Sequence, residues 1–260
     1  MLTGSWVYIA ALAASFTVAT VASPAGVSGA VLLLPFQVGV LGTPSPSVTP
    51  TNLLYNVVAT PGALYRYWRQ GQTGGRLTRL LVLGTLPGVI VGSVIRVELL
   101  PGQTSFDIVI ACVLIPLGAW LLIGQSPQTQ RPWALPPSLL IVIAAVVGCV
   151  GGIYGIGGGA ILAPILIGSG RPPAEVAPAT LASTFVTSAA GVATFLVLSI
   201  HHHGSIAPDW GVGIALGIGG LLGGYTGARL QPHLPESAIR HLLGLLVLAI
   251  GIRYAWLAIG

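Results

Sequence analysis

Charged residues are scarce in this chain of 260 residues. Ten basic and five acidic residues make up 6% of the sequence, and every basic residue is an arginine. A water-soluble globular protein carries about 25% charged residues, so the composition excludes that class. Hydrophobic residues account for 54% of the chain, and its mean hydropathy is +0.91. We therefore expect an integral membrane protein that lies in a lipid bilayer.

Cysteine and strand-like alternation are also rare. Cys112 and Cys149 both lie inside apolar segments, so we interpret them as small core residues without a disulfide. No segment alternates polar and apolar residues, which argues against a β-barrel. The run His201–His203 is short and contiguous, and it is typical of a solvated loop. We expect neither a cofactor nor a metal.

Long apolar segments dominate what is present. Several approach the roughly 20 residues that a membrane-spanning helix requires. They cover residues 6–22, 51–68, 77–95, 106–123, 139–151, 180–200, 210–229 and 239–257. The first resembles a secretion signal, but no positive residue precedes it and its repeat partner lies in mid-chain.

The two halves of the chain repeat one another. Pro35 and Pro164 are separated by 164 − 35 = 129 residues. The same offset pairs Gly26 with Gly155, Gly29 with Gly158, Thr51 with Thr180, Gly62 with Gly191 and Gly75 with Gly204. We predict repeat 1 over residues 1–123, a cytoplasmic linker over 124–137 and repeat 2 over 138–260, together forming one structural domain.

A glycine-rich break interrupts the apolar sequence near the start of each repeat. The breaks cover residues 23–29 and 151–159, and short apolar runs follow at 30–41 and 160–168. The first run would reach about 18 Å as a helix, against a hydrocarbon core of about 30 Å. The first two segments of each repeat could each span the membrane or form a re-entrant hairpin, and the sequence leaves both open.

The arginines favour inverted repeats. An odd number of crossings per repeat places eight arginines on one side and only Arg96 and Arg253 on the other, whereas an even number gives six against four. Cytoplasmic loops are enriched in basic residues, so the more uneven division is favoured. We predict an all-α membrane protein with two inverted-topology repeats of about five helical segments each, and with a broken or short helix near the start of each.

The breaks predict a polar site. Irregular backbone at membrane depth must be buried in protein or line a wet cavity. Gly29 and Gly158 precede the short helices, whose N-termini favour anions, and glycine there permits left-handed backbone angles and a close approach of the ligand. The candidate binding residues in the breaks are Gly26, Ser28, Gly29, Gly155, Gly157 and Gly158. Helix packing is the alternative role for glycines, and we assign it to Gly88, Gly92, Gly219 and Gly223.

Polar side chains follow each break. One set is Thr51, Asn52, Tyr55, Asn56 and Thr60, and the other is Thr180, Ser183, Thr184, Thr187 and Ser188. Spacings of three and four place Asn52 with Asn56, and Thr180 with Thr184 and Thr187, on common helix faces. From these sets we predict Thr51, Asn52, Asn56, Thr180, Thr184 and Thr187 as binding residues, with hydrogen bonding between helices as the alternative.

The break motifs resemble those of a known family. Gly26 to Ala30 reads Gly-Val-Ser-Gly-Ala, and Gly155 to Pro164 reads Gly-Ile-Gly-Gly-Gly-Ala-Ile-Leu-Ala-Pro. Each is followed by a helix rich in threonine, and the chain is similar over nearly its whole length to the sulfite exporter TauE/SafE family of membrane permeases. The resemblance implies a multi-pass plasma-membrane transporter of small sulfur-containing anions, such as sulfite or organosulfonates.

Energy coupling and oligomeric state are left open. Asp107 and His241 are the candidates for proton coupling, with helix capping or solvation at the interface as the alternative. The net charge of +5 indicates contact with anionic lipid and does not indicate nucleic-acid binding. A homo-oligomer is compatible with the sequence.

Two further functions were weighed against a transporter. Ser28 between glycines, with His241 on another helix, resembles a rhomboid intramembrane serine protease, but the repeat equivalent of Ser28 is Gly157. Residues 155–160 also match a dinucleotide fingerprint, without the βαβ context that it needs. A non-transporting membrane scaffold fits the composition but gives no reason for two broken helices. We therefore expect no enzymatic activity.

Overall fold

The computed structural model is built almost wholly of helices. It describes residues 5–44, 47–72, 74–99, 104–123, 136–201 and 206–259. The first half contains α1 (Trp6–Ala22), the short 3₁₀ helix η1 (Ser23–Ala25), α2 (Ala30–Gly39), α3 (Val48–Arg69), α4 (Arg76–Glu98) and α5 (Thr104–Ile123). The second contains α6 (Pro137–Tyr154), α7 (Gly159–Gly168), α8 (Pro173–His201), α9 (Trp210–Leu230), η3 (Gln231–His233) and α10 (Glu236–Ile259).

The repeat predicted from the sequence coincides with the helix order. The short helices α2 and α7 both have ten residues, and both of their ends are related by the offset of 159 − 30 = 168 − 39 = 129. The second break is shorter than predicted. Gly151 and Gly152 are wound into α6, so the break covers only residues 155–158. Because they lack side chains, these two glycines can pack closely inside α6. Gly151 lies against the backbone of Gly157, and Gly152 lies against the backbone of Val89.

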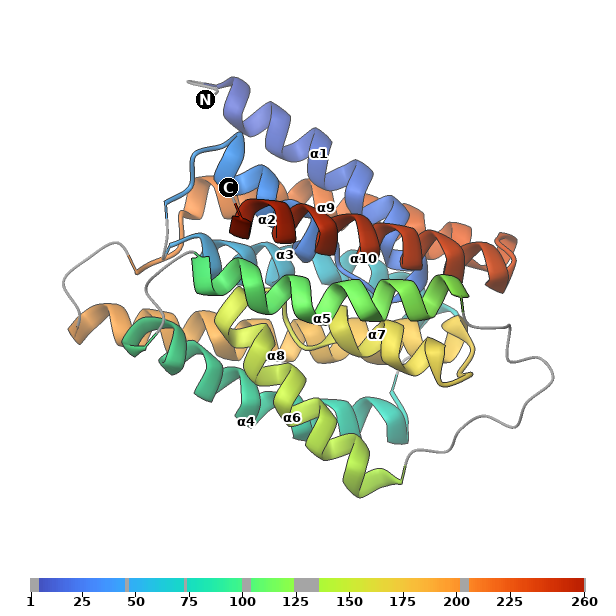
Figure 1. The fold of residues 1–260 in the computed structure, drawn as a ribbon. Helices are drawn as coiled ribbons and strands as arrows, with labels where there is room; N and C mark the ends of the chain where they lie inside the picture. The colour runs from blue at the N-terminus through green and yellow to red at the C-terminus, as the bar shows by residue number, and fades with distance from the viewer. Residues whose placement is uncertain are drawn as a thin grey trace.

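The most extensive helix contacts join the two halves. α1 packs on α9, α4 on α6 and on α8, α3 on α8 and on α9, and α5 on α10. Figure 1 shows α5 and α10 side by side across the front of the molecule, with α4 and α6 along the lower edge and α1 along the upper edge. Repeat equivalence exchanges α1 with α6 and α4 with α9, so the pairs α1–α9 and α4–α6 are counterparts. The halves therefore interlock as one body.

Four helices begin or end together at what we call the arginine end. The N-termini of α4, α6 and α8 line one cavity, and Gln231, just after α9, donates a hydrogen bond of 3.3 Å to the carbonyl of Pro173 at the start of α8. Thus α4 begins where its repeat equivalent α9 ends, as the inverted-repeat hypothesis requires. This end also carries Arg66, Arg69, Arg76, Arg79, Arg171 and Arg229. By the positive-inside rule, we expect this end to face the cytoplasm.

The first two helices of each repeat form a hairpin that returns to its starting end. At the end opposite the arginine end, Gly211 of α9 lies close to Tyr8 of α1, and the main-chain N–H of Asp209 donates to Thr51 of α3 at 2.8 Å. α1 and α3 therefore start at the same end, so α2 carries the chain back. α6 and α8 both start at the arginine end, so α7 does the same. Both arrangements that the sequence leaves open return the chain in this way. α1 and α6 are long and apolar enough to cross a membrane, whereas α2 and α7 have only ten residues each.

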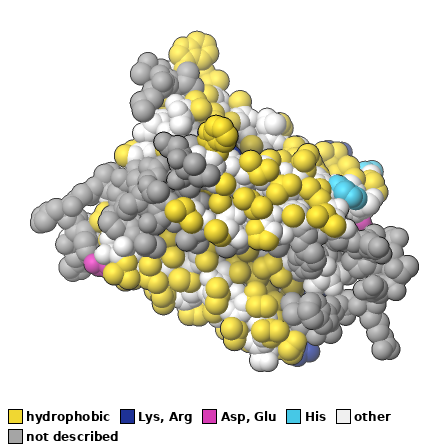
Figure 2. Space-filling view, in the orientation of Figure 1, with side chains coloured by type: hydrophobic (Ala, Val, Ile, Leu, Met, Phe, Trp, Pro, Cys, Tyr) yellow, Lys and Arg dark blue, Asp and Glu magenta, His cyan; other side chains and the backbone are white. Residues whose placement is uncertain are grey.

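The surface suits a bilayer. Six helices have the length and apolar composition to cross a membrane, namely α1, α4, α6, α8, α9 and α10. On the face drawn in Figure 2, hydrophobic side chains cover the middle, and the visible charged and histidine side chains lie at the left and right edges. Cys112 is exposed on α5, so its expected place in the core is wrong, whereas Cys149 is half-buried. Both thiols are free.

The predicted packing glycines hold the interlocking helices together. A Cβ atom on Gly88 or Gly92 would overlap backbone atoms of α6, at Ala145 and Cys149. A Cβ atom on Gly219 or Gly223 would overlap backbone atoms of α1, at Leu12 and Phe16. Helix pairs α4–α6 and α1–α9 therefore approach as closely as they do because these positions lack side chains.

Candidate functional site

Side chains from other elements donate hydrogen bonds to four carbonyl groups of the first break. Its carbonyl oxygens would otherwise be buried without partners, because most of this segment is not helical. Tyr67 donates to the oxygen of Ser23 at 3.2 Å, Gln231 to that of Pro24 at 2.6 Å, Thr180 to that of Gly26 at 2.9 Å, and Tyr55 to that of Ser28. Two of the donors, Gln231 and Thr180, come from the other half of the chain.

The second break is held in a similar way by α3 and α8. Thr49 Oγ1 lies 3.4 Å from the carbonyl oxygen of Ile153, and Asn56 Nδ2 lies 3.5 Å from that of Gly155. The hydroxyl of Thr184 accepts from the first main-chain N–H of α7, that of Gly159, at 3.1 Å. Both breaks thus contact α8, about one helical turn apart, at Thr180 and at Thr184.

Glycine is required in the breaks by backbone angle. Gly26 and Gly155 are repeat equivalents, and both end a helix in the left-handed conformation, with φ of 80° and 71°. The next positive φ falls on Gly29 in the first break and on Gly157 in the second, one position apart in the repeat register. Gly158 has φ of −68°, so the left-handed angle expected there is found at its neighbour.

Buried main-chain N–H groups at both breaks remain without a protein acceptor. Within the described part of the chain, the amides of Ser28, Gly29, Gly157 and Gly158 donate to no protein atom. The four residues are buried and form two repeat-equivalent pairs, and they lie just before the N-termini of α2 and α7. An unmade hydrogen bond from a buried donor costs about 1–3 kcal/mol. The breaks therefore hold unpaired buried amides, and within the described residues the carbonyls of Ala25, Val27, Ile156 and Gly157 likewise accept from no protein atom.

The polar residues predicted on α3 and α8 are all buried, but they do different things. Thr180, Thr184 and Asn56 contact a break, as described above. Asn52 binds α2, since it donates to the carbonyl of Ala30 at 3.1 Å and accepts from Gln37 at 2.8 Å. Thr51 bonds to Ser47 in its own turn and holds the start of α9, and Thr187 donates to Ser183 in its own helix.

Several site residues were missed by reasoning from the sequence. Gln37, Thr49, Thr85 and Ser93 are buried polar side chains on α2, α3 and α4. Thr85 shares a hydrogen bond of 2.8 Å with Ser183, and its methyl group lies against Gly158. Gln37, Thr85 and Ser93 are each a single polar residue in an apolar segment, which carries no periodic signal, and Thr49 lies among the prolines and serines that precede the third apolar segment. Only the position of Gln37 inside a short apolar run could have drawn attention.

Arg96 is the most consequential of the missed residues. The sequence places it at the edge of a loop, but it is the last-turn arginine of α4 and is only 1% exposed. Its Nε lies 3.4 Å from the hydroxyl of Thr49, which in turn reaches the carbonyl of Ile153 just before the second break. It is the one charged side chain that is buried among the described residues. A guanidinium in a low-dielectric interior attracts anions strongly.

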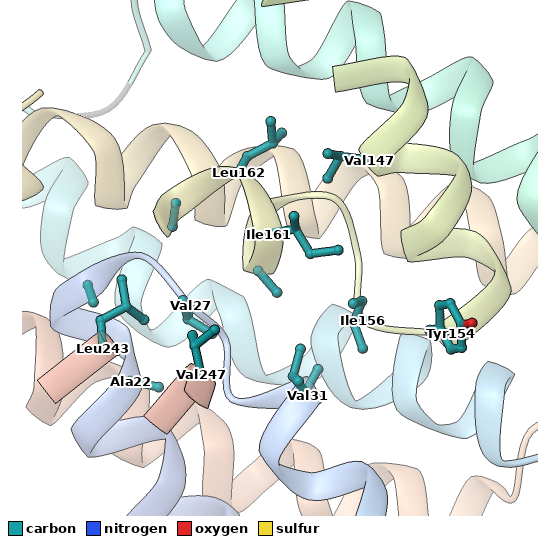
Figure 3. Close-up of a cluster of buried hydrophobic side chains, with 14 of the residues drawn as sticks. Ala22, Val27, Val31, Val147, Tyr154, Ile156, Ile161, Leu162, Leu243 and Val247 are labelled. Atoms are coloured by element: carbon teal, nitrogen blue, oxygen red, sulfur yellow. The ribbon is translucent and has the colours of Figure 1, made fainter. Parts of the chain in front are cut away.

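Apolar side chains close the breaks off on one side. Figure 3 shows Val27 and Val31 from the first break and α2, and Ile156 and Ile161 from the second break and α7, gathered in one cluster with Val247 of α10. These side chains are buried. The glycines of the breaks face other elements: Gly26 and Gly157 lie against α8, Gly155 against α3, and Gly158 against Thr85 of α4.

Of the two proton-coupling candidates, the structure describes the side chain of His241. The side chain of Asp107 lies outside the described residues. His241 is exposed, and its Nδ1 lies 2.6 Å from the carbonyl of Ser237 in its own helix. Ser28 is buried and its hydroxyl accepts from the main-chain N–H of Ala30 at 3.4 Å. The structure thus does not bring Ser28 and His241 together as a protease dyad.

Comparison with known proteins agrees with this architecture. A family model described as "Sulfite exporter TauE/SafE" matches residues 11–254. The chain is similar to a "Probable membrane transporter protein" of Xylella fastidiosa (strain 9a5c), with 26% identity over 89% of this chain and 88% of the relative. It is also similar to the "Probable membrane transporter protein YjnA" of Bacillus subtilis (strain 168), with 25% identity over 88% and 92%.

No solved structure matches the chain. The relatives cover the same length as this chain, so the similarity extends through both halves and both breaks. With a family model that matches nearly the whole sequence, and with a helical multi-pass membrane fold, the chain belongs to the sulfite exporter TauE/SafE family of membrane transporters.

Proposed function

We propose that the protein is a secondary transporter that moves small sulfur-containing oxyanions, such as sulfite or organosulfonates, across the plasma membrane. The substrate would bind where the two breaks contact α3 and α8. The observation that carries the proposal is a set of buried main-chain amides at the two breaks, those of Ser28, Gly29, Gly157 and Gly158, which have no protein acceptor.

An oxyanion is the ligand that matches these free groups. It offers only acceptors, and the N-termini of α2 and α7 add the positive ends of two helix dipoles. The buried charge of Arg96 near the second break favours an anion over a neutral or cationic solute. No carboxylate is buried among the described residues to oppose it. Sulfite and sulfonates present three oxygens on a small headgroup, which suits donors spread over two short segments.

Neutral groups near the amides allow the anion to leave again. Ser188 Oγ and Asn56 Oδ1 are buried without a hydrogen-bond partner, and a side chain at Gly157 would contact Ser188. The serine hydroxyl can donate to a bound oxyanion, and the amide group of Asn56 can reorient to do so. Neutral donors bind an anion more weakly than a cluster of charges does. A carrier with alternating access needs such moderate binding, because it must release the anion on the other side.

The test is a counterflow screen in proteoliposomes. Vesicles preloaded with an unlabelled candidate anion are given the labelled form of the same anion outside. We expect accumulation for sulfite or a small organosulfonate and not for an organic cation of similar size. Counterflow of cations alone, or of no solute at all, would overturn the proposal and favour the non-transporting scaffold.

Coupling to protons is a separate part of the proposal. Repeating the screen with and without a pH gradient measures whether proton movement drives uptake. Asp107→Asn and His241→Gln then test the two residues that the sequence puts forward. Loss of the gradient effect with counterflow intact identifies a coupling residue, and an unchanged gradient effect in both variants removes both residues from consideration.

A further inference from the structure

A cavity of about 630 Å³ opens at the arginine end, between α4, α6 and α8. Arg76, Arg171 and Glu175 lie at its more exposed rim, and the buried side chains of Leu77, Leu140 and Ala179 form its inner wall. Its volume is that of a typical small-molecule site, about 300–1,000 Å³. A hydrated oxyanion fits such a space easily.

The rim carries an excess of positive charge. Arg171 forms an ion pair of 2.6 Å with Glu175, and this is the only salt bridge within the described ranges. Arg76 therefore adds a full positive charge to the rim that no described carboxylate neutralises. The backbone adds to it, since α4, α6 and α8 all begin at this cavity and direct the positive ends of their dipoles toward it.

The inner wall leads toward the second break. Leu77, Leu81 and Thr85 are four residues apart on α4, so they lie along one helix face. Leu77 lines the cavity, Leu81 is fully buried one turn deeper, and Thr85 lies against Gly158 in the break. Ala179 and Ser183 follow the same order on α8, and Ser183 shares the 2.8 Å hydrogen bond with Thr85. One buried layer therefore separates the cavity from the polar groups at the break.

We propose that this cavity is a cytoplasmic vestibule that collects small oxyanions, and that Leu81 closes its inner end in this conformation. The inference rests on the proposed function for the direction in which the anion moves. The vestibule itself is defined by its own charge and shape. Opening requires the side chain of Leu81 to move and the Thr85–Ser183 hydrogen bond to break. These two changes would join the cavity to the amides of the second break.

Thiol labelling tests the vestibule without any transport measurement. The background carries Cys112→Ala and Cys149→Ala, and Leu80→Cys places one thiol in the cavity wall. The probes are two methanethiosulfonates, one ending in a sulfonate and one in a trimethylammonium group. Ser237→Cys, exposed near the start of α10 and outside the cavity lining, is the matched control at the same end.

We expect the sulfonate probe to react faster, relative to the cationic probe, at Leu80→Cys than at Ser237→Cys. Arg76→Gln should lower this ratio by about fivefold, the effect of one unit charge at about 4 Å in water. Arg79→Gln removes the same charge from an exposed site outside the lining and should change the ratio much less. Equal ratios at the two thiols, or equal effects of the two arginine variants, would overturn the charge assignment.

The side of the membrane gives a second readout. Leu80→Cys should react in inside-out vesicles and not in intact cells, and reaction from outside only would overturn the cytoplasmic assignment. Because labelling does not depend on uptake, anion-selective labelling together with a negative counterflow screen would retain the vestibule and reject the proposed substrates. Non-selective labelling together with a positive counterflow screen would reject the vestibule and retain the proposed substrates.

The closure by Leu81 is tested with a deeper thiol. Thr85→Cys should be unreactive when Leu81 is present and should gain reactivity when Leu81→Ala is added. Since Leu81→Ala removes a fully buried side chain and could impair folding, Leu81→Val provides a milder opening with a smaller gain. Fast reaction of Thr85→Cys with Leu81 intact, or no gain in either well-folded variant, would show that Leu81 does not close the cavity.

Discussion

Thr180 Oγ1 lies 2.9 Å from the carbonyl oxygen of Gly26, and this contact joins α8 of the second half to the break of the first. The same hydroxyl also lies 2.9 Å from the carbonyl of Val176 in its own helix, so one proton serves two acceptors. The carbonyl of Thr180 packs against Gly159 at the start of α7. A single residue of α8 therefore touches both broken segments.

Thr180→Val should destabilise the protein by about 1 kcal/mol, because it preserves shape but leaves the Gly26 carbonyl buried without its donor. Thr180→Ser keeps the hydroxyl and should cost less. Thermal unfolding in detergent measures both. The control is Thr194→Val, whose hydroxyl bonds only to Ala190 in its own helix. Equal losses for Thr180→Val and Thr194→Val would show that the contact between halves contributes nothing.

Arg96→Gln should raise the KM for a sulfur oxyanion by about ten- to thirtyfold, the effect of a unit charge about 8–10 Å away at an effective dielectric constant of about 20. Arg96→Lys keeps the charge and should raise KM less. Arg253→Gln, on an exposed position of α10, is the control for net charge. An unchanged KM in a stably folded Arg96→Gln protein would remove Arg96 from the site.

Ser28→Ala should keep counterflow within about twofold of the parent, because the main-chain N–H that we assign to the substrate is retained and only the weak bond to Ala30 is lost. A rhomboid-type protease would lose all activity with this change. An α-hydroxy acid incorporated at position 28 replaces the N–H with an ester oxygen. It should weaken anion binding by about tenfold or more, as expected for a hydrogen bond to a charged group. Equal binding by the ester and the amide would contradict the role of this donor.

Gly219→Ala should destabilise the protein by about 1–3 kcal/mol, since its methyl group would overlap the backbone of Leu12 in α1. Gly39→Ala is the matched control, because a Cβ atom there meets no atom within 4 Å. That variant should instead gain up to about 1 kcal/mol from helix propensity. Thermal unfolding of the two variants side by side makes the comparison, and a stable Gly219→Ala protein would show that α1 and α9 can separate at little cost.

The sequence predicts the large features of this fold because they repeat. The apolar runs predicted at 30–41 and 160–168 locate α2 and α7 within two residues, and Gly26 and Gly155, related by the offset of 129, mark two helix ends with nearly the same backbone angles. Apolar segments locate the other long helices within three residues, whereas α8 begins seven residues before the segment predicted at 180–200. The inverted orientation follows from arginine counts and is consistent with the helix directions in the structure.

Individual polar partners could not be predicted, because they depend on how the halves interlock. Thr51 and Thr180 are equivalent in the repeat, yet Thr180 reaches a break and Thr51 holds the start of α9. Arg96 resembles a loop residue in the sequence, since leucines and a proline-glycine turn follow it. Arg96 is buried because α3 and α6 pack against α4. The sequence of α4 alone contains no pattern that predicts this packing.

The exchange of contacts between the halves bears on how such a chain could have arisen. A single unit with half this length would leave the carbonyl of its own break, and the close-packed glycines of its fourth helix, facing lipid. Such a unit would be stable only beside a second copy inserted upside down, so the gene fusion would have joined two subunits of an antiparallel dimer. Within one chain the two halves need not stay identical, and buried Arg96, whose repeat equivalent is Tyr225, is one such difference.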